Sequence, residues 1–255
     1  MRILFKTNYK QDLNLAKHGG HRFWYGLLIL VLFAAPIILG GYYIGEATRI
    51  LIYAMAGLGL MVLTGFTGQV SLGHAAFLAI GAYTNAWFLA QGFSSFVALP
   101  MAALLSMIGG LLVAIPAARM SGIYLAIATL AFAIIVEDFA GHLNSITGGN
   151  RGMMVDVPML FGYQIWESWE LYLFVLSILV AATLAVLNIL RSPLGRAMIA
   201  VRDSEVSSQA LGVNPMKIKV FAFTMSAAIT GLAGAFLAHY MSFLTPQIFG
   251  ILLSI

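Results

Sequence analysis

The sequence predicts an all-α fold, a polytopic bundle of transmembrane helices, from its composition, its hydropathy pattern and the placement of its charges. Hydrophobic residues make up 61% of the 255 residues and charged residues only 9%, whereas a soluble domain carries roughly 25% charged residues. A soluble core of this length could not bury so much apolar surface, because a folded chain leaves much of its surface facing the solvent. Lipid is therefore expected to be the solvent for most of the chain.

Long runs without a charged residue alternate with short polar segments, and the runs are long enough for helices that cross the hydrocarbon core in about 20 residues. About seven spans are expected, at 23–43, 48–65, 70–91, 96–118, 121–141, 170–190 and 219–241. The first run is interpreted as an uncleaved span and not as a signal peptide. It is too long for a signal peptide, and no small-x-small cleavage site follows it.

The basic residues predict the orientation of the chain. Of the 13 Lys and Arg residues, all but Arg49 and Arg151 fall on one side when the chain is threaded through a bilayer from its basic N-terminus. This is the positive-inside pattern, which places the N-terminus in the cytoplasm. Nucleic acid is not an expected partner, because no aromatic side chains that could stack on nucleotides lie among these Lys and Arg residues. The expected segments are cytoplasmic 1–22 and transmembrane 23–255, with an external loop 142–169 and a cytoplasmic loop 191–218.

Small residues lie four apart on one face of the last expected span, at Ala227, Gly231 and Ala235. In lipid, small residues let helix backbones approach closely. We therefore expect this helix to pack tightly inside the bundle. The spacing indicates packing and says nothing about function.

The segment 65–83 carries the densest signal in the sequence. Three glycines interrupt its apolar run among polar neighbours, namely Gly65, Gly68 and Gly73 beside Thr64, Thr67, Gln69, Ser71 and His74. Two interpretations stay open. One is a broken helix at membrane depth, whose freed backbone groups are satisfied by protein or by a water-filled cavity. The other is a tight cytoplasmic turn between two ordinary spans.

Histidine and acidic residues in the expected spans offer little support for a catalytic or metal site. A lone histidine such as His74 is more often packed and hydrogen-bonded than a ligand, and no second His or Cys lies at metal-ligand spacing, so no metal is expected. Glu137 and Asp138 are adjacent near the outer end of the fifth span. Neighbouring residues on a helix point in different directions, which makes them a poor acid–base pair. We interpret them as marking the water interface, with a proton-relay role left open.

The loop 191–215 is expected to form short amphipathic helices lying across the inner face. Ser192 followed by Pro193 is a typical helix start. Asp203 is expected to cap a second short helix that ends at Gly212. The loop mixes basic with acidic side chains, which favours docking in a protein groove over binding to bare anionic lipid.

These segments, taken in order, resemble one family: the membrane-spanning permease subunits of bacterial ABC importers for branched-chain amino acids, of the second of two paired permease types. The likeness extends over roughly residues 50–250. The matching stretches are 67–77, 81–83, 122–132, 147–152, 192–197, 202–205, 210–214, 217–223, 231–235 and Pro246. Each stretch alone is weak evidence, whereas the ordered set is strong.

The resemblance implies a multi-pass subunit of the bacterial inner membrane that carries branched-chain or related small amino acids. Its implied partners are a second permease subunit, two cytoplasmic ATPase subunits and an external substrate-binding protein. The loop 192–212 would couple to an ATPase through Gly195, Arg196, Asp203, Glu205 and Gly212. The segment 64–74 would lie along the translocation path, with Thr67, Gly68, Gln69, Ser71, Gly73 and His74 as its residues.

Two departures from the family pattern stand out. Family members continue with a glycine-rich stretch and further spans, whereas this sequence stops at Ser254 and Ile255, so it is expected to be truncated at its C-terminus. Arg151 stands in the outer loop where family members often carry an acidic or neutral residue.

Two other function classes remain as alternatives. The sequence has no nucleotide-binding loop of the form Gly-x4-Gly-Lys-Ser/Thr, so energy must come from a partner or from an ion gradient. An ion-coupled secondary transporter is the alternative, and Glu137 and Asp138 are its only acidic candidates. An intramembrane enzyme ranks lower, because His74 with Ser71 lacks a third catalytic member. We expect a subunit that is not an enzyme and needs no cofactor.

Overall fold

The computed structural model describes residues 19–120, 122–160, 163–250 and 253. Most of the expected segment 1–22 and the last two residues lie outside this part of the chain. Within it the fold is all-α apart from short two-residue strands, which confirms the predicted fold class.

Seven helices of the described chain occupy the places of the seven expected spans. They are α2 (Gly19–Ile38), α3 (Gly41–Leu60), α4 (His74–Ala90), α5 (Ser95–Ala117), α6 (Ile123–His142), α8 (Ser168–Arg191) and α11 (Pro215–Met241). Among the residues that the structure describes, five segments are long and apolar enough to cross a membrane, namely Gly41–Gly65, Ser95–Ala117, Ile123–His142, Ser168–Arg191 and Pro215–Met241. The helix α2 adds a shorter apolar stretch, Phe23–Ile38.

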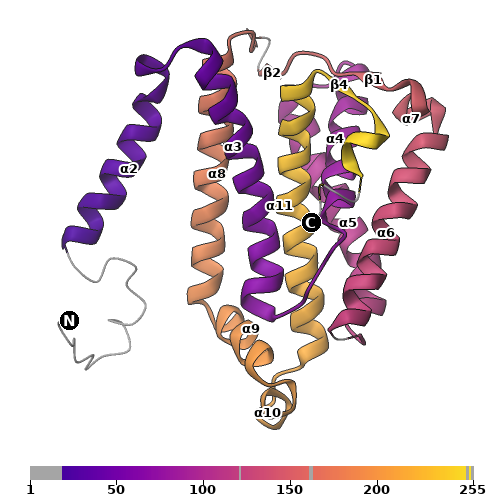
Figure 1. The fold of residues 1–255 in the computed structure, drawn as a ribbon. Helices are drawn as coiled ribbons and strands as arrows, with labels where there is room; N and C mark the ends of the chain where they lie inside the picture. Colours follow the sequence, from indigo (N-terminus) through magenta and orange to yellow (C-terminus); the bar gives the residue numbers. More distant parts are fainter. Residues whose placement is uncertain (1–18, 121, 161–162, 251–252, 254–255) are drawn as a thin grey trace.

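Successive helices run in opposite directions, so their connections alternate between two ends of the bundle (Figure 1). One end carries α9 (Pro193–Asp203) and α10 (Glu205–Ala210), and we call it the α10 end. The other carries α7 (Asn144–Thr147), which names the α7 end. This alternation agrees with the threading inferred from the charges.

The helix α11 forms the centre of the bundle and packs against α3, α4 and α5. The close approach depends on small residues. A Cβ atom on Gly81 of α4 would collide with the backbone of Gly231, and one on Gly234 would collide with the backbone of Leu78. Ala227, Ala233, Ala235 and Ala238 are fully buried. The predicted tight packing of this helix is confirmed.

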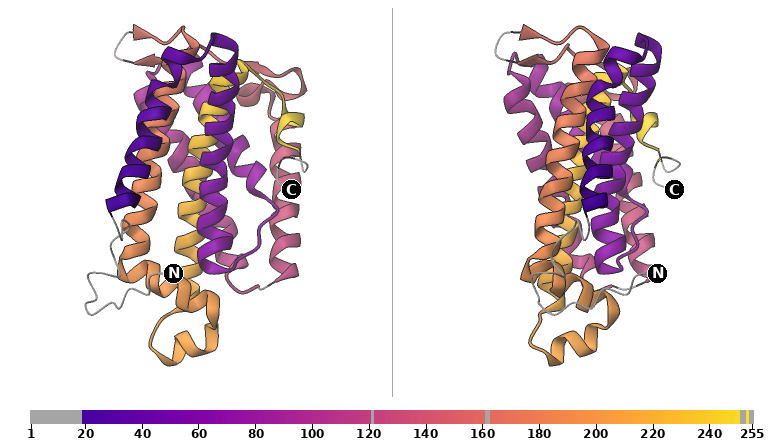
Figure 2. Two further views of the ribbon diagram at one scale, coloured as in Figure 1. Left: turned by 60° about the vertical axis from the view of Figure 1, so that its left-hand side comes forward. Right: turned by 90° about the vertical axis from the view of Figure 1, so that its left-hand side faces the viewer.

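The helices α2 and α8 lie together at one edge of the bundle, and α6 lies towards the opposite edge (Figure 2). The hydroxyl of Tyr172 in α8 donates a hydrogen bond to the carbonyl oxygen of Leu32 in α2, at 2.9 Å. The helices at both edges, α2, α8 and α6, present apolar side chains outwards, as expected of surfaces that face lipid.

The connection between α3 and α4 departs from regular helix. The helix α3 ends in a π-helical turn, η1 (Met61–Gly65), and residues 68–73 are non-helical before α4 begins at His74. Figure 1 shows this link climbing from the α10 end into the bundle. The 17 residues of α4 span about 26 Å, less than the roughly 30 Å of a hydrocarbon core. The expected span 70–91 therefore begins in non-helical backbone.

The α7 end is built from short elements. After α7 come a 3-10 turn, η2 (Gly149–Arg151), and three strands, β1 (Met153–Met154), β2 (Met159–Leu160) and β3 (Tyr163–Gln164). Strand β2 pairs with β3 in an antiparallel hairpin, and β1 pairs antiparallel with β4 (Phe243–Leu244), which follows α11. The β1–β4 pair ties the long loop to the end of α11.

After β4 the chain turns back towards the bundle through η3 (Pro246–Phe249). The side chain of Phe249 is buried and its ring centroid lies 5.9 Å from that of Tyr83 in α4. This aromatic contact holds η3 against α4.

At the α10 end, one helix start matches the prediction and one does not. Ser192 caps α9, its hydroxyl accepting a hydrogen bond from the backbone N–H of Leu194 at 3.2 Å. Asp203 does not cap α10, and that expectation was wrong. Ser204 is the cap, because it has extended backbone angles and accepts from the N–H of Ser207 at 3.2 Å. Asp203 is the last residue of α9.

Candidate functional site

The polar residues of segment 64–74 form a continuous chain of hydrogen bonds between helices. His74 Nδ1 lies 3.0 Å from the Ser71 hydroxyl, and Nε2 lies 2.8 Å from the hydroxyl of Ser226 in α11. Ser226 donates to the carbonyl oxygen of Gly59 in α3, at 2.6 Å. The backbone N–H of Gly73 donates to Ser71 Oγ at 3.4 Å. The chain joins α3, the non-helical link, α4 and α11.

The donors in this chain determine the tautomer of the histidine. A serine hydroxyl has one proton, and Ser226 uses its proton on Gly59, so Ser226 Oγ accepts from Nε2–H of His74. No ion pair joins this ring to a carboxylate of the described chain, and a buried cation requires a partner, so the ring is neutral. Nδ1 of the neutral ring then accepts from the Ser71 hydroxyl, and both nitrogens are satisfied. This agrees with the interpretation of His74 as a packed residue.

The non-helical link is held deep within the bundle by side chains of other elements. The N–H of Leu72 donates to the Thr129 hydroxyl of α6, at 3.0 Å. Ser226, the partner of His74, lies about 16 Å along α11 from its first residue. Backbone at such depth needs protein partners, because lipid offers none. Of the two interpretations of this segment, the geometry agrees with the broken helix and not with a tight turn at the surface.

The predicted path residues are mostly buried and bonded within the protein. Thr67, Gln69, Ser71, Gly73 and His74 are buried, whereas Gly68 is exposed. The Thr67 hydroxyl donates to the carbonyl oxygen of Leu63 at 2.6 Å, and Gln69 Nε2 donates to Thr67 at 3.0 Å and to the carbonyl oxygen of Lys219 at 3.4 Å. The structure therefore brings the predicted residues together as an interhelical junction.

The loop at the α10 end reaches this junction through Arg202 of α9. Its Nη1 donates to the carbonyl oxygen of Gly65, at the end of the π-helical turn, at 2.9 Å. The same guanidinium pairs with Asp203 at 3.1 Å. Gly68 lies under Arg202 with φ of +69°, and a Cβ atom there would stand 3.0 Å from Cγ of the arginine. A residue with a side chain would be strained and crowded at this position.

A second contact joins α10 to α11. Lys219 Nζ lies 2.6 Å from a carboxylate oxygen of Glu205. The lysine side chain is only 6% exposed, whereas that of the glutamate is 47% exposed. An ammonium group this deeply buried requires a partner, so this ion pair fixes α10 against the start of α11.

The five predicted coupling residues have different surroundings. Gly195 is buried, and a side chain there would collide with the backbone of Leu190, so its role is packing of α9 on α8. Gly212 has φ of +83° and follows Leu211, the residue that caps the end of α10. Arg196, Asp203 and Glu205 are exposed or half-exposed and lie on the surface of the α10 end.

Sequence reasoning missed the apolar tip of this end. Val206 in α10 is 79% exposed and Leu211, just after it, is 81% exposed. Figure 1 shows α10 as the part of the described chain that projects furthest from the bundle. The signal was present in the sequence as two apolar residues inside a polar loop. Sequence reasoning also missed Arg202, Lys219, Ser226 and Thr129 as partners of the junction, since these contacts link residues far apart in the chain.

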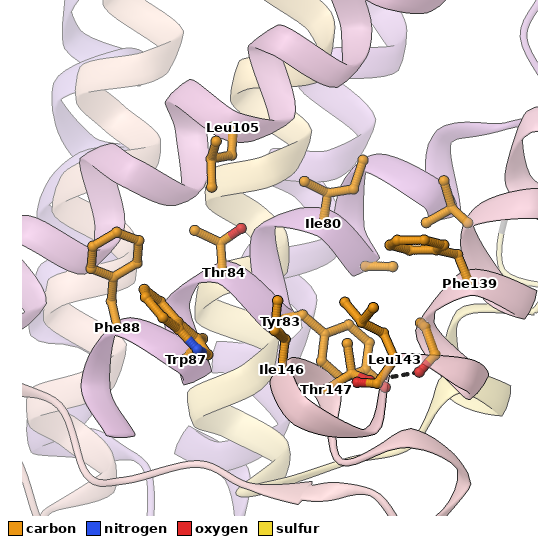
Figure 3. A pocket seen from close by; sticks show the side chains of 13 residues that line it. Ile80, Tyr83, Thr84, Trp87, Phe88, Leu105, Phe139, Leu143, Ile146 and Thr147 are labelled. Carbon is orange, nitrogen blue, oxygen red and sulfur yellow. Dashed lines mark hydrogen bonds between the residues drawn. The ribbon is translucent and has the colours of Figure 1, made fainter. Parts of the chain in front are cut away.

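Two cavities of similar size lie towards the α7 end. One has a volume of about 380 Å³ and apolar walls from α4, α5, α6 and α7, including Trp87, Phe88 and Phe139 (Figure 3). Such walls suit hydrocarbon and offer no partner for the charges of an amino acid. The other, also of about 380 Å³, has mixed polar and apolar walls between α3, α8, α11 and the long loop.

The acidic pair of α6 lies at the surface of the α7 end. The side chains of Asp138 and His142 are mostly exposed and lie 3.5 Å apart. Glu137 and Asp138 border a separate surface cavity with Asn150 and Gln247. This position agrees with their interpretation as interface residues.

Comparison with known proteins identifies the family. The chain matches the family model described as the permease component of branched-chain amino acid transport systems over residues 42–255. It is 35% identical over 247 residues to the high-affinity branched-chain amino acid transport system permease protein LivM of Salmonella typhimurium strain LT2, covering 87% of this chain and 58% of that protein.

The protein of the same name from Escherichia coli strain K12 is 35% identical over 252 residues, covering 89% of this chain and 59% of that protein. The chain thus spans about three-fifths of the length of these curated relatives. No solved structure matches the chain. The family match covers most of the sequence, and the helices are those of a multi-pass membrane protein. The chain belongs to the family of permease components of branched-chain amino acid transport systems.

Proposed function

We propose that this chain is a permease subunit of an ABC importer, which carries branched-chain or related small amino acids across the bacterial inner membrane. ATP is hydrolysed by two partner ATPase subunits, and a second permease subunit and an external binding protein complete the assembly. The chain itself hydrolyses nothing. The α10 end and the N-terminus face the cytoplasm, which follows the positive-inside pattern.

The observation that carries this proposal is the apolar tip of the α10 end. Val206 and Leu211 are each about four-fifths exposed on an element that projects from the bundle. Large apolar side chains exposed on a projecting helix favour burial in a partner's groove. Exposed charges around the tip, at Arg196, Asp203 and Glu205, would orient that docking.

Two contacts would transmit a displacement of the tip to the transmembrane helices. The Glu205–Lys219 ion pair ties α10 to the start of α11, the central helix. The Arg202–Gly65 hydrogen bond ties α9 to the break between α3 and α4. Closure of the partner ATPases would therefore displace α11 and the α3–α4 break together, which biases the bundle between two arrangements.

The segment 64–74 borders the translocation path in this proposal. A broken helix can change shape where an unbroken one cannot, because its backbone bonds are made to neighbours and not along its own axis. Its hydrogen-bond chain through His74 would hold one arrangement closed until α11 moves. The supporting observation is the depth of the break within the bundle.

Co-purification and tip variants test the proposal together. The full chain is purified from membranes in mild detergent, and a P-loop ATPase should co-elute. Replacing both Val206 and Leu211 by Asp should abolish co-elution and amino acid uptake, because charged tips cannot enter an apolar groove. Met154→Asp is the matched control, since Met154 is 80% exposed at the opposite end.

Two results would contradict the proposal. One is an unchanged complex with the double tip variant. The other is accumulation of amino acid by the chain alone in liposomes that hold an ion gradient and no ATP, which would favour a secondary transporter.

A further inference from the structure

The cavity with apolar walls is a feature that the proposed function has not used. It has a volume of about 380 Å³ and lies between α4, α5 and α6, with α7 forming its wall towards the α7 end. We call it the α4–α6 cavity. Figure 3 shows Trp87 and Phe88 on one side of it and Phe139 on the other. An occupant would therefore contact several helices at once.

The cavity lies where α6 stops packing closely on its neighbours. Near its start, α6 is tight against the non-helical link, since a Cβ atom on Gly73 would collide with the backbone of Thr129. About one turn further on, the ring centroid of Phe132 lies 5.6 Å from that of Phe77 in α4. Beyond this point Val136 lines the cavity instead. The width of the cavity thus sets how far this half of α6 stands from α4.

The depth of the cavity matches the acyl chains of one leaflet. At a rise of about 1.5 Å per residue, the lining residues Ala79 and Phe88 lie about 16 Å and 3 Å from Ala90, the last residue of α4. Leu105 lies about 15 Å along α5 from its first residue, Ser95. Half of a hydrocarbon core measures about 15 Å. The cavity therefore lies within the hydrocarbon of the leaflet at the α7 end.

The rim of the cavity is made of side chains that face lipid. Leu105, Phe139 and Ile146 line the cavity and are exposed, Phe139 by 61%. Ala79 and Ala140 also line it and are buried, so they form its floor. Exposed apolar surface at this depth meets hydrocarbon and not water. The cavity is therefore reached from the bilayer.

The polar side chains of the lining offer little to a ligand. The Thr147 hydroxyl donates to the carbonyl oxygens of Ala140 and Leu143, at 2.6 and 2.8 Å. The hydroxyl oxygen of Tyr83 has less than 1 Å² of accessible surface. A charged ligand would lose its hydration here without replacement. The chemistry of the walls therefore favours a hydrocarbon.

Size distinguishes a lipid chain from a helix of another protein. A helix with its side chains is about 10–12 Å wide, so a single turn occupies on the order of 500 Å³. The cavity, of about 380 Å³, is smaller than that turn. An unbranched acyl chain is narrow enough to lie along the groove. Filling it is favourable, because side chains around an empty space lose their dispersion contacts.

We propose that the α4–α6 cavity binds one acyl chain of a membrane phospholipid, taken from the leaflet at the α7 end. The chain holds α6 apart from α4 in this half of the bundle. Because the Thr129 hydroxyl of α6 accepts from the N–H of Leu72, the occupant also sets the angle at which α6 meets the non-helical link. The inference goes beyond the proposed function and requires only that the chain spans a membrane.

Trp87 in the cavity wall reports on the occupant. The sequence holds four tryptophans, so replacing Trp24, Trp166 and Trp169 by Phe leaves Trp87 as the only indole. The full chain is placed in nanodiscs of phosphatidylcholine or of phosphatidylcholine brominated in the middle of one acyl chain. Bromine quenches indole fluorescence on contact, so the brominated lipid should quench Trp87.

A pair of Val→Phe variants separates a bound chain from ordinary surrounding lipid. Val136→Phe puts a phenyl ring into the cavity and should lower the quenching about twofold or more, because the closely packed space cannot hold both. Val31→Phe makes the same change on α2, where Val31 is 53% exposed, and should leave the quenching unchanged. Ile80→Phe fills the same cavity from α4 and replaces Val136→Phe if that variant does not give a monodisperse protein.

Native mass spectrometry from mild detergent gives a second measurement. The unaltered protein and Val31→Phe should retain one phospholipid, and the cavity-filling variant should lose it. Equal quenching in both Val→Phe variants means that only surrounding lipid reaches Trp87, which overturns the inference. Absence of a retained phospholipid overturns it as well. So does loss of the quenching in the assembled complex, because a partner subunit would then cover the cavity. None of these measurements follows transport, so their failure leaves the proposed function standing.

Discussion

The guanidinium Nη1 of Arg202 lies 2.9 Å from the carbonyl oxygen of Gly65, joining two residues that are 137 positions apart. Gly65 is the last residue of the π-helical turn, and a carbonyl at that place has lost its regular helical partner. Arg202 thus satisfies the break between α3 and α4 from a helix on the surface of the bundle. The contact makes the geometry of the break depend on the position of α9.

Loss of this contact should weaken coupling. In the reconstituted complex, Arg202→Gln should raise the number of ATP molecules hydrolysed for each amino acid transported, because α9 no longer holds Gly65. ATP hydrolysis and uptake are measured in the same proteoliposomes. Lys217→Gln is the control, since Lys217 is an exposed cation near the same end. An unchanged ratio in Arg202→Gln would show that the contact transmits nothing.

The Glu205–Lys219 pair should show the asymmetry of a partly buried ion pair. Glu205→Gln leaves a lysine that is 6% exposed without its counter-charge, and it should lower the free energy of unfolding by about 1–3 kcal/mol, less than a fully buried pair. Lys219→Met keeps the apolar part of the side chain and should lower the free energy of unfolding by less than Glu205→Gln does. Thermal unfolding in detergent measures both. Adding Lys219→Met to Glu205→Gln should restore most of the lost free energy of unfolding. A double variant that is less stable than either single variant would contradict this account.

Removing the hydroxyl of Ser226 should destabilise the protein, because this hydroxyl links His74 to Gly59. Ser226→Ala leaves His74 Nε2–H and the carbonyl oxygen of Gly59 without their buried partner, which costs about 1–3 kcal/mol of stability for each orphaned group. The midpoint of thermal unfolding should fall clearly. Ser177→Ala, which removes an exposed hydroxyl of α8 bonded within its own helix, should leave the midpoint nearly unchanged. Equal midpoints for the two variants would refute the prediction.

The close contact between α4 and α11 at Gly81 should not tolerate a methyl group. Gly81→Ala would place Cβ against the backbone of Gly231, and we expect a loss of about 1–3 kcal/mol from forced separation of α4 and α11. Gly57→Ala is the matched control, because no atom lies within 4 Å of its Cβ position. It should be neutral or stabilising by up to about 1 kcal/mol. Unfolding is followed by loss of the monodisperse peak on heating in detergent.

The sequence predicted the helices well and the contacts between them poorly, for a physical reason. Lipid demands long apolar segments with satisfied backbones, so all seven helices could be placed from hydropathy, and the small-residue face of α11 could be recognised from spacing. The capping residue of α10 was misplaced by one position, because Asp203 and Ser204 are both good caps and only the backbone angles decide between them.

The site was harder to predict than the fold. Polar residues in 64–74 were recognised by their type, but their partners Ser226, Thr129 and Arg202 lie in other helices, and no periodicity in a single sequence pairs them. Asn85 and His239 escaped notice for the same reason. Each is an isolated polar residue in an apolar helix, and only the packing of α4 on α11 brings them together.

The chain from Gly73 through Ser71, His74 and Ser226 to Gly59 begins at an amide N–H and ends at a carbonyl oxygen. Neither terminus can give up or take on H⁺ in ordinary conditions, so this chain of hydrogen bonds cannot relay protons. A membrane protein built this way can hold an ionisable ring in its interior without conducting protons across the bilayer, and the electrochemical gradient is preserved.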